Sequence, residues 1–115
     1  MTNIKALGGC VVSNNIIQQK GKLKWCVREK SISEADNGWR FFSEIDTEEF
    51  LENPKNMSVW GFDTVIEIEP AVMQIYTMPV GTDIFLVDEM GVKFFADTET
   101  GERIKIANGM GEGNE

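Results

Sequence analysis

Residues 37–43 read NGWRFFS, an Asn-Gly pair followed by a run in which three aromatic residues flank one arginine. Asn-Gly is a strong turn signal and aromatic residues favour strands, so the stretch predicts a turn that leads into a strand. Successive side chains of a strand point to opposite faces, which places Trp39 and Phe41 together on one face. Arg40 then shares the other face with Phe42.

Arg40 has two interpretations: it grips an anion at the rim of a site, or it forms an ion pair inside the fold. Its planar guanidinium suits the first role because it binds carboxylate or phosphate at two points and stacks on aromatic rings. The second role needs an acid nearby, and the segment that follows offers Glu44 and Asp46. We favour the ion pair, which would specify the fold more than stabilise it.

Two segments upstream also have strand patterns. Residues 6–12 (ALGGCVV) are apolar and partly β-branched, and residues 13–15 (SNN) can cap a short turn of helix after them. In residues 22–29 (KLKWCVRE), every second residue from Leu23 to Val27 is large and apolar. This alternation is typical of a strand that is buried on one face.

An acidic helix is predicted after the central strand, over residues 46–53 (DTEEFLEN). Asp46 is the expected N-cap, and Glu49 three residues later approximates a capping box. Pro54 would end the helix.

A longer helical zone follows, FDTVIEIE and then PAVMQIYTM. Asp63 would cap the first part, and Pro70 fits the first turn of a second helix, where proline is tolerated. Val72, Ile75 and Tyr76 are spaced i, i+3, i+4, so this face should pack on the core.

The last third of the chain reads as a β-meander over residues 83–87, 92–96 and 103–107, with turns between the strands. Residues 108–115 have little to bury and should form a flexible tail. The prediction is an α+β fold: one globular domain over residues 1–107, with a mostly antiparallel sheet and two or three short helices inserted before the C-terminal meander.

Length and composition agree with one soluble domain. A chain of 115 residues with 42% hydrophobic residues is long enough to bury a core without metals or disulfides. No apolar run approaches the roughly 20 residues that span a bilayer, and the N-terminus lacks the order of a signal peptide, so we expect a cytosolic protein. Cys10 and Cys26 lie in apolar runs and should be buried thiols; a disulfide needs their strands to pair and would not persist in a reducing cytosol.

Charge limits the choice of partner. The net charge of −8 and the pI of about 4.5 argue against nucleic acid, which needs a basic surface, and favour a basic protein. Residues 1–30 carry six Lys or Arg and one acid, or +5, whereas residues 31–115 carry five Lys or Arg and 18 acids, or −13. One part of the folded molecule should therefore be strongly negative.

The sequence offers little for catalysis. It contains no histidine, which excludes Ser–His and Cys–His pairs and most catalytic zinc sites. Glu48, Glu49 and Glu52 could supply a carboxylate pair, but acids on a short helix usually form a solvated face. The glycines match no phosphate-binding loop, and the acids match no calcium loop. We therefore predict no enzyme, no metal and no cofactor.

Trp60, in the segment SVWGF, also has two interpretations. It could anchor an interface, since tryptophan is enriched at binding hot spots. Packing in the core is the interpretation we favour.

Several stretches together resemble the Imm-thirty-three-like family of small bacterial proteins, long catalogued as a domain of unknown function. They are CVVS (10–13), VREK (27–30), NGWRFFS (37–43) and DTEEFLENPKNMSVWGFDTVIEIEPAVMQIYTMPVGTDIF (46–85), and the resemblance covers roughly residues 8–86. The family pattern often has a glycine where this chain has Glu44, and a tyrosine where it has Phe50. The resemblance implies an immunity protein that binds a toxin's active domain, and it carries over no catalytic residues.

Two functional hypotheses follow. In the first, the chain binds and neutralises a cognate, possibly basic, toxin. The predicted partner-binding residues are Glu44, Asp46, Glu48, Glu49, Glu52 and Trp60. In the second, a regulatory domain grips a small anion through Arg40 in an aromatic-lined cleft beside Trp39.

Overall fold

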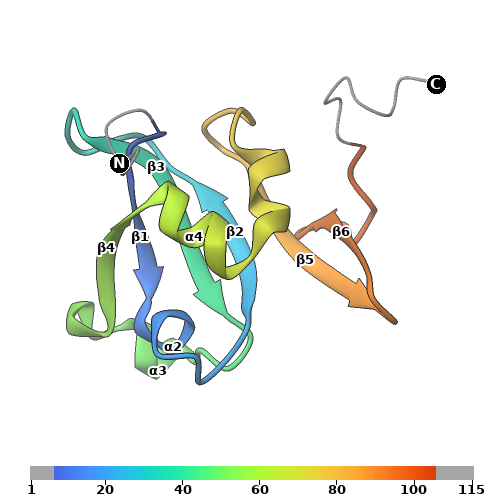
Figure 1. The fold of residues 1–115 in the computed structure, drawn as a ribbon, viewed down its shortest axis with the longest axis horizontal. Helices are drawn as coiled ribbons and strands as arrows, with labels where there is room; N and C mark the ends of the chain where they lie inside the picture. Colours follow the sequence, from blue (N-terminus) through green and yellow to red (C-terminus); the bar gives the residue numbers. More distant parts are fainter. Residues whose placement is uncertain (1–6, 106–115) are drawn as a thin grey trace.

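A computed structural model describes residues 7–105 and places the WRFF strand at the centre of a six-stranded sheet (Figure 1). The strands are β1 (Gly9–Ser13), β2 (Leu23–Arg28), β3 (Asp36–Ser43), β4 (Met57–Gly61), β5 (Asp83–Glu89) and β6 (Val92–Asp97). Their order is β4-β1-β3-β2-β5-β6, and only β1 and β3 pair in parallel. The predicted α+β class with a mostly antiparallel sheet is confirmed.

Short helices cover one face and one end of the sheet (Figure 1). They are α2 (Asn14–Ile17), α3 (Glu48–Leu51) and α4 (Phe62–Ile68), with the 3₁₀ helices η1 (Pro54–Asn56) and η2 (Pro70–Ile75). Figure 1 shows α4 lying across the sheet, while α2 and α3 lie together at one end. The predicted start of a helix at Pro70 is confirmed, although the helix is 3₁₀.

The core lies between α4, η2 and the sheet. Trp39 and Phe41 are fully buried, as the alternation predicts, and their rings stack with centroids 5.9 Å apart. Phe62 of α4 packs on Phe41 at 5.8 Å, and Tyr76 meets Phe62 edge-on at 4.8 Å. Such aromatic pairs contribute about 0.5–1.5 kcal/mol each beyond the area that they bury. The aromatic residues of β3 therefore join the sheet to its helical layer.

The predicted turn at Asn37 and Gly38 is wrong, since both residues lie inside β3 and are buried. Gly38 has a φ of +90°, and the pairing of β1 with β3 shifts register over this stretch. Asn37 uses its side chain within the fold, accepting from the Trp39 N–H at 2.8 Å and donating to the Leu7 carbonyl at 2.9 Å. The two residues thus form an irregularity within the strand.

The simple alternation predicted for the second strand is also wrong. Leu23 and Cys26 are its buried residues, while Trp25 and Val27 are half-buried. A register shift between Leu23 and Trp25 changes the phase of the strand, because a bulge adds one residue to one side of a ladder.

The C-terminal meander is only partly confirmed. Strands β5 and β6 form a regular hairpin, but the third segment makes a single bridge, between Ala96 and Arg103. Residues 106 and 107 and the predicted tail over 108–115 lie outside the described residues.

The two cysteines are free, buried thiols, as predicted. Cys10 lies in β1 and Cys26 in β2, and β3 separates these strands, so they do not pair directly. Within residues 7–105, no helix has the length and apolar character needed to cross a membrane.

Candidate functional site

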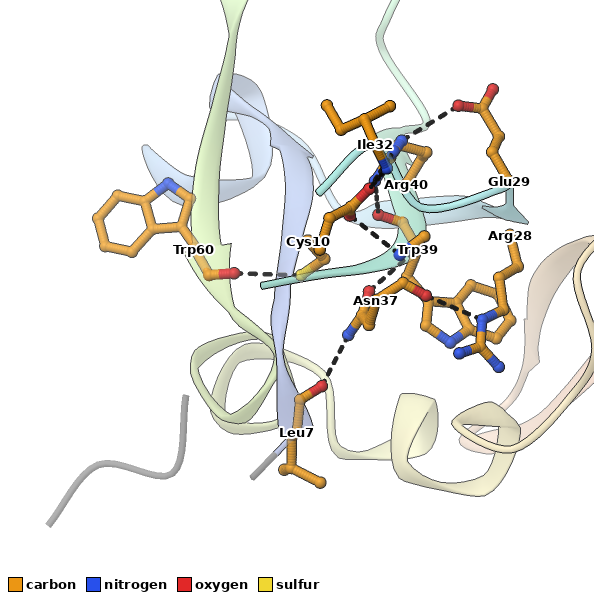
Figure 2. Close-up of polar contacts among 11 residues, drawn as sticks. Leu7, Cys10, Arg28, Glu29, Ile32, Asn37, Trp39, Arg40 and Trp60 are labelled. Atoms are coloured by element: carbon orange, nitrogen blue, oxygen red, sulfur yellow. Dashed lines mark hydrogen bonds and ion pairs between the residues drawn. The ribbon is translucent and has the colours of Figure 1, made fainter. Parts of the chain in front are cut away.

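Arg40 lies at the centre of an ion-pair cluster at the start of β3 (Figure 2). Its two terminal nitrogens each approach one carboxylate oxygen of Asp36 at 2.9 Å, and its Nε donates to Glu29 at 3.1 Å. Nη1 also donates to the carbonyl of Trp39 at 3.0 Å. The preference for an internal ion pair is confirmed, but Glu44 and Asp46 are the wrong partners, because the side chain reaches back toward Asp36.

The anion-clamp interpretation loses its basis in this geometry. Four hydrogen bonds to groups of the chain itself use most of the five guanidinium donors of Arg40. The residue is only 6% exposed. A free anion would have to displace the carboxylate of Asp36 to reach it.

Besides pairing with Arg40, Asp36 also organises the loop before β3. Its two oxygens accept hydrogen bonds from the backbone N–H groups of Ile32 and Gly38. The hydrogen bond from Arg40 is the main reason that the pKa of Asp36 falls far below its ordinary value, and burial opposes this shift only in part. Sequence reasoning missed Asp36 because it placed a turn between this residue and the strand.

Trp39 is a core residue with a polar anchor. Its indole N–H donates to the carbonyl of Tyr76 at 3.2 Å, and the guanidinium of Arg28 lies 5.7 Å from the ring centroid. Arg28 also donates to the carbonyl of Asn37 at 2.9 Å (Figure 2). It donates to the carbonyl of Met78 at 2.7 Å as well. This arginine, which the sequence did not single out, joins β3 to the segment after η2.

Asp46 also belongs to the fold's own contacts. It accepts hydrogen bonds from the Ser13 hydroxyl at 3.0 Å, the Asn15 side-chain amide at 2.8 Å and the Ser43 N–H at 2.8 Å. The expected helix cap at Asp46 is wrong, because Thr47 is the N-cap of α3. Asp46 therefore ties the end of β3 to α2.

The remaining acids of this segment are exposed. Thr47 accepts from the Phe50 N–H at 3.0 Å, which starts α3 and turns Glu48, Glu49 and Glu52 outward. Together with Glu44 they form what we call the acidic surface: Glu44, Glu48, Glu49 and Glu52. No member of it forms an ion pair with any residue in the range 7–105.

The basic residues near the N-terminus gather elsewhere. Lys20, Lys22 and Lys24 line a shallow groove of about 1080 Å³ between the start of β2 and β5. The same groove is lined by acids, among them Glu67, Glu69 and Asp88, so positive and negative charges are mixed there. Of the acidic surface only Glu44 borders this groove; Glu48, Glu49 and Glu52 do not line it.

Trp60 is not in the core. It lies on β4, the edge strand next to β1, and is 38% exposed. Its indole N–H donates to the Ser58 hydroxyl at 2.7 Å, and Ser58 donates to the side chain of Asn14 at 2.6 Å. The preference for core packing is therefore wrong; edge position depends on strand order, which the local sequence does not specify.

The thiol of Cys10 lies beside this edge and donates to the carbonyl of Trp60 at 3.4 Å (Figure 2). Burial raises the pKa of Cys10 to about 12, and burial also raises the pKa of Cys26. Within the described residues, no group of three or more His, Cys, Asp or Glu side chains is placed to hold a metal ion.

Both thiols should resist alkylation in the folded protein. Iodoacetamide attacks the thiolate, so at pH 8 we expect labelling at least about 100-fold slower than in urea-unfolded chain. Intact mass spectrometry over time gives both rates. Rapid native labelling of either cysteine would contradict its burial.

Comparison with known proteins identifies a family. The model of the Immunity protein Imm33 domain matches residues 10–107. This match extends past residue 86, where the resemblance in the sequence ended, and includes the β5–β6 hairpin. No curated protein and no solved structure matches the chain. Since the match covers most of the 115 residues, the chain belongs to the Imm33 immunity protein family.

Proposed function

We propose that this chain binds and neutralises a cognate toxin domain through the acidic surface. Membership of the Imm33 family supports an immunity-type role, and such a role implies a toxin partner. The family is generally non-enzymatic, which agrees with a chain that acts by binding. In this proposal the protein works in the cytosol of the cell that makes the toxin and covers the toxin's active region.

The choice of surface rests on the exposed acids of α3, which form no ion pair among the described residues. Glu48, Glu49 and Glu52 are exposed and form no ion pair with the described residues, whereas the Lys-rich groove has acids of its own. Helix α3 lies at the end of the sheet where β4 begins, so the acids are close to that edge strand (Figure 1). Unpaired surface charge of one sign speeds the approach of an oppositely charged partner and limits wrong partners.

Charge reversal on α3 tests this surface. The candidate partner is a toxin domain encoded by a gene next to the gene for this chain. In Glu48→Lys/Glu49→Lys/Glu52→Lys, we expect the association rate with that domain to fall at least about 10-fold at low salt. Salt screens the attraction between the acids and a basic partner, so the wild-type rate should fall as salt is added. The rate of the variant, which lacks these acids, should depend less on salt. Stopped-flow measurements from about 0.02 to 0.5 M salt give both quantities.

A matched control separates local from global charge. Glu89→Lys/Glu99→Lys/Glu102→Lys changes the same number of exposed acids on and after the β5–β6 hairpin, away from α3. Its association rate should stay within about 3-fold of the wild-type rate if steering is local. Equal rates for the two triple variants would contradict binding through the acidic surface. If the wild-type chain did not bind the toxin domain at all, that domain would not be its partner.

A further inference from the structure

The two edges of the sheet are finished differently. The edge at β6 is covered by the chain that follows it: Arg103 bridges Ala96, and the Ile104 N–H donates to the carbonyl of Phe95 at 2.8 Å. The guanidinium of Arg103 also lies 4.5 Å from the ring centroid of Phe94. This edge therefore has part of its backbone satisfied and carries a charged side chain.

The edge at β4 is less protected, although the Met57 N–H already donates to the carbonyl of Pro54. No described strand pairs with its outer side (Figure 1). Residues 57–61 read MSVWG, with no charge and no proline, and their five pairs with β1 run without a bulge. Natural sheets usually protect an edge with charged side chains, proline, a bulge or a covering segment. Over residues 58–60 this edge lacks all of these, so it is able to accept another strand there.

The direction of the backbone groups on β4 follows from its pairing. The Phe62 N–H donates to the carbonyl of Gly8 at 3.0 Å. These two residues continue the register of β1 and β4 by one pair, so the backbone groups of Phe62 point toward β1. Backbone groups alternate sides along an antiparallel strand. The N–H and C=O of Val59 therefore point away from β1, where a further strand would pair. Met57 and Gly61 face the same way, but the Met57 N–H already donates to the carbonyl of Pro54, and Gly61 is buried at the start of α4.

Two apolar side chains border this free edge on opposite faces of the strand. Val59 is 75% exposed, and Trp60 next to it is 38% exposed. Figure 2 shows the indole of Trp60 lying outside β4, on the side away from Cys10 of β1. An added strand would find an apolar contact on each of its two faces, next to its backbone hydrogen bonds.

We propose that β4 receives an extended segment of the toxin as a seventh strand of the sheet. This inference rests on the proposed function. It specifies how the side of the molecule formed by β4 and α3 binds the toxin. Only a few residues separate Glu52 from Met57, so the segment should carry basic side chains where it passes α3. A second copy of this chain would bring another −8 of charge toward the acidic surface, whereas a basic segment is attracted to it.

Proline at Val59 tests the backbone pairing. The N–H of this residue faces away from β1, so Val59→Pro removes no hydrogen bond of the sheet, and proline is tolerated on an edge strand in that orientation. It removes the outward donor of Val59, and we expect affinity for the adjacent-gene toxin domain to fall about 30-fold or more. Val59→Ala removes part of the side-chain contact but keeps the backbone donor, so its affinity should fall less than that of Val59→Pro, by about 10-fold at most. Calorimetric titration measures both affinities, and thermal unfolding checks both folds.

Amide hydrogen exchange on the wild-type complex tests the same pairing without any substitution. The amide of Val59 should gain protection when the toxin domain binds, and those of Ser58 and Trp60, which already face β1, should change much less. Binding by Val59→Pro at wild-type affinity, or a complex without this alternating protection, would overturn strand addition while leaving the proposed function in place. A chain that dimerises through β4 without toxin would also overturn it, and a wild-type chain that binds no toxin would contradict the proposed function.

Discussion

Replacing Asp36 with asparagine is expected to destabilise the protein by about 3 kcal/mol or more, because it leaves the buried guanidinium of Arg40 without its main counter-ion. The side chains of Arg40 and Asp36 are only 8% and 10% exposed, and two hydrogen bonds of 2.9 Å join them. Asparagine keeps the size of the side chain but can offer only one oxygen, and its amide N–H₂ would face another donor. Urea unfolding at pH 7 measures the change in free energy.

Glu29 provides the matched control for this prediction. It also pairs with Arg40, at 3.1 Å, but its side chain is 61% exposed. Exposed ion pairs contribute little, so Glu29→Gln should cost less than about 1 kcal/mol. If the two variants lost the same stability, burial would not be what makes the Asp36 pair important.

The same pair predicts how stability depends on pH. The pKa of Asp36 is lower in the folded protein than in the unfolded chain, mainly because of its hydrogen bond with Arg40. Its stabilising contribution is therefore complete above about pH 5 and is lost as the pH falls toward the folded-state pKa. Wild-type protein should lose stability between about pH 5 and pH 2 more steeply than Asp36→Asn. Parallel curves for the two proteins in that range would contradict this assignment.

Gly38→Ala is expected to be at least as damaging, with a loss of about 3 kcal/mol or more, because conformational strain and a backbone clash add together. Gly38 has a φ of +90°, which L-residues rarely adopt, and an added Cβ would overlap the carbonyl oxygen of Glu29. The Glu29 N–H donates to the carbonyl of Gly38 at 2.8 Å, so the two backbones cannot separate without losing this bond.

Gly91 separates the two causes. Its φ of +87° is nearly the same, but an added Cβ there meets nothing within 4 Å. Gly91→Ala should therefore show the conformational strain alone, about 1 kcal/mol. Thermal and urea unfolding of both variants gives the comparison. A loss at Gly38 no larger than the loss at Gly91 would show that the contact with Glu29 is not the constraint.

Much of the fold could be predicted because local patterns govern it. Alternation along WRFF correctly placed Trp39 and Phe41 in the core, and helical spacing correctly turned Val72 and Ile75 inward. The irregular points were missed. The register shifts in β2 and β3 depend on neighbouring strands, and Asn37 contributes to packing where its sequence context indicates a turn.

The candidate site was predictable only in part. Glu48, Glu49 and Glu52 are exposed, as expected for acids on a short helix, and the sequence alone shows this pattern. The exposure of Trp60 follows from β4 pairing on one side only, with β1, which comes more than 40 residues earlier in the chain. Strand order of this kind depends on distant parts of the sequence, so the edge that we propose as the binding strand could not be found from local patterns.

Co-expression with the toxin tests the central claim most directly. Cells that make the toxin domain encoded beside this gene would also make wild-type chain, Glu48→Lys/Glu49→Lys/Glu52→Lys, or the control Glu89→Lys/Glu99→Lys/Glu102→Lys, at matched protein levels. The proposed function predicts that the wild-type chain and the control preserve growth and that the α3 variant does so far less well. Equal protection by all three would contradict neutralisation through the acidic surface, and no protection by the wild-type chain would contradict its role as the immunity protein of that toxin.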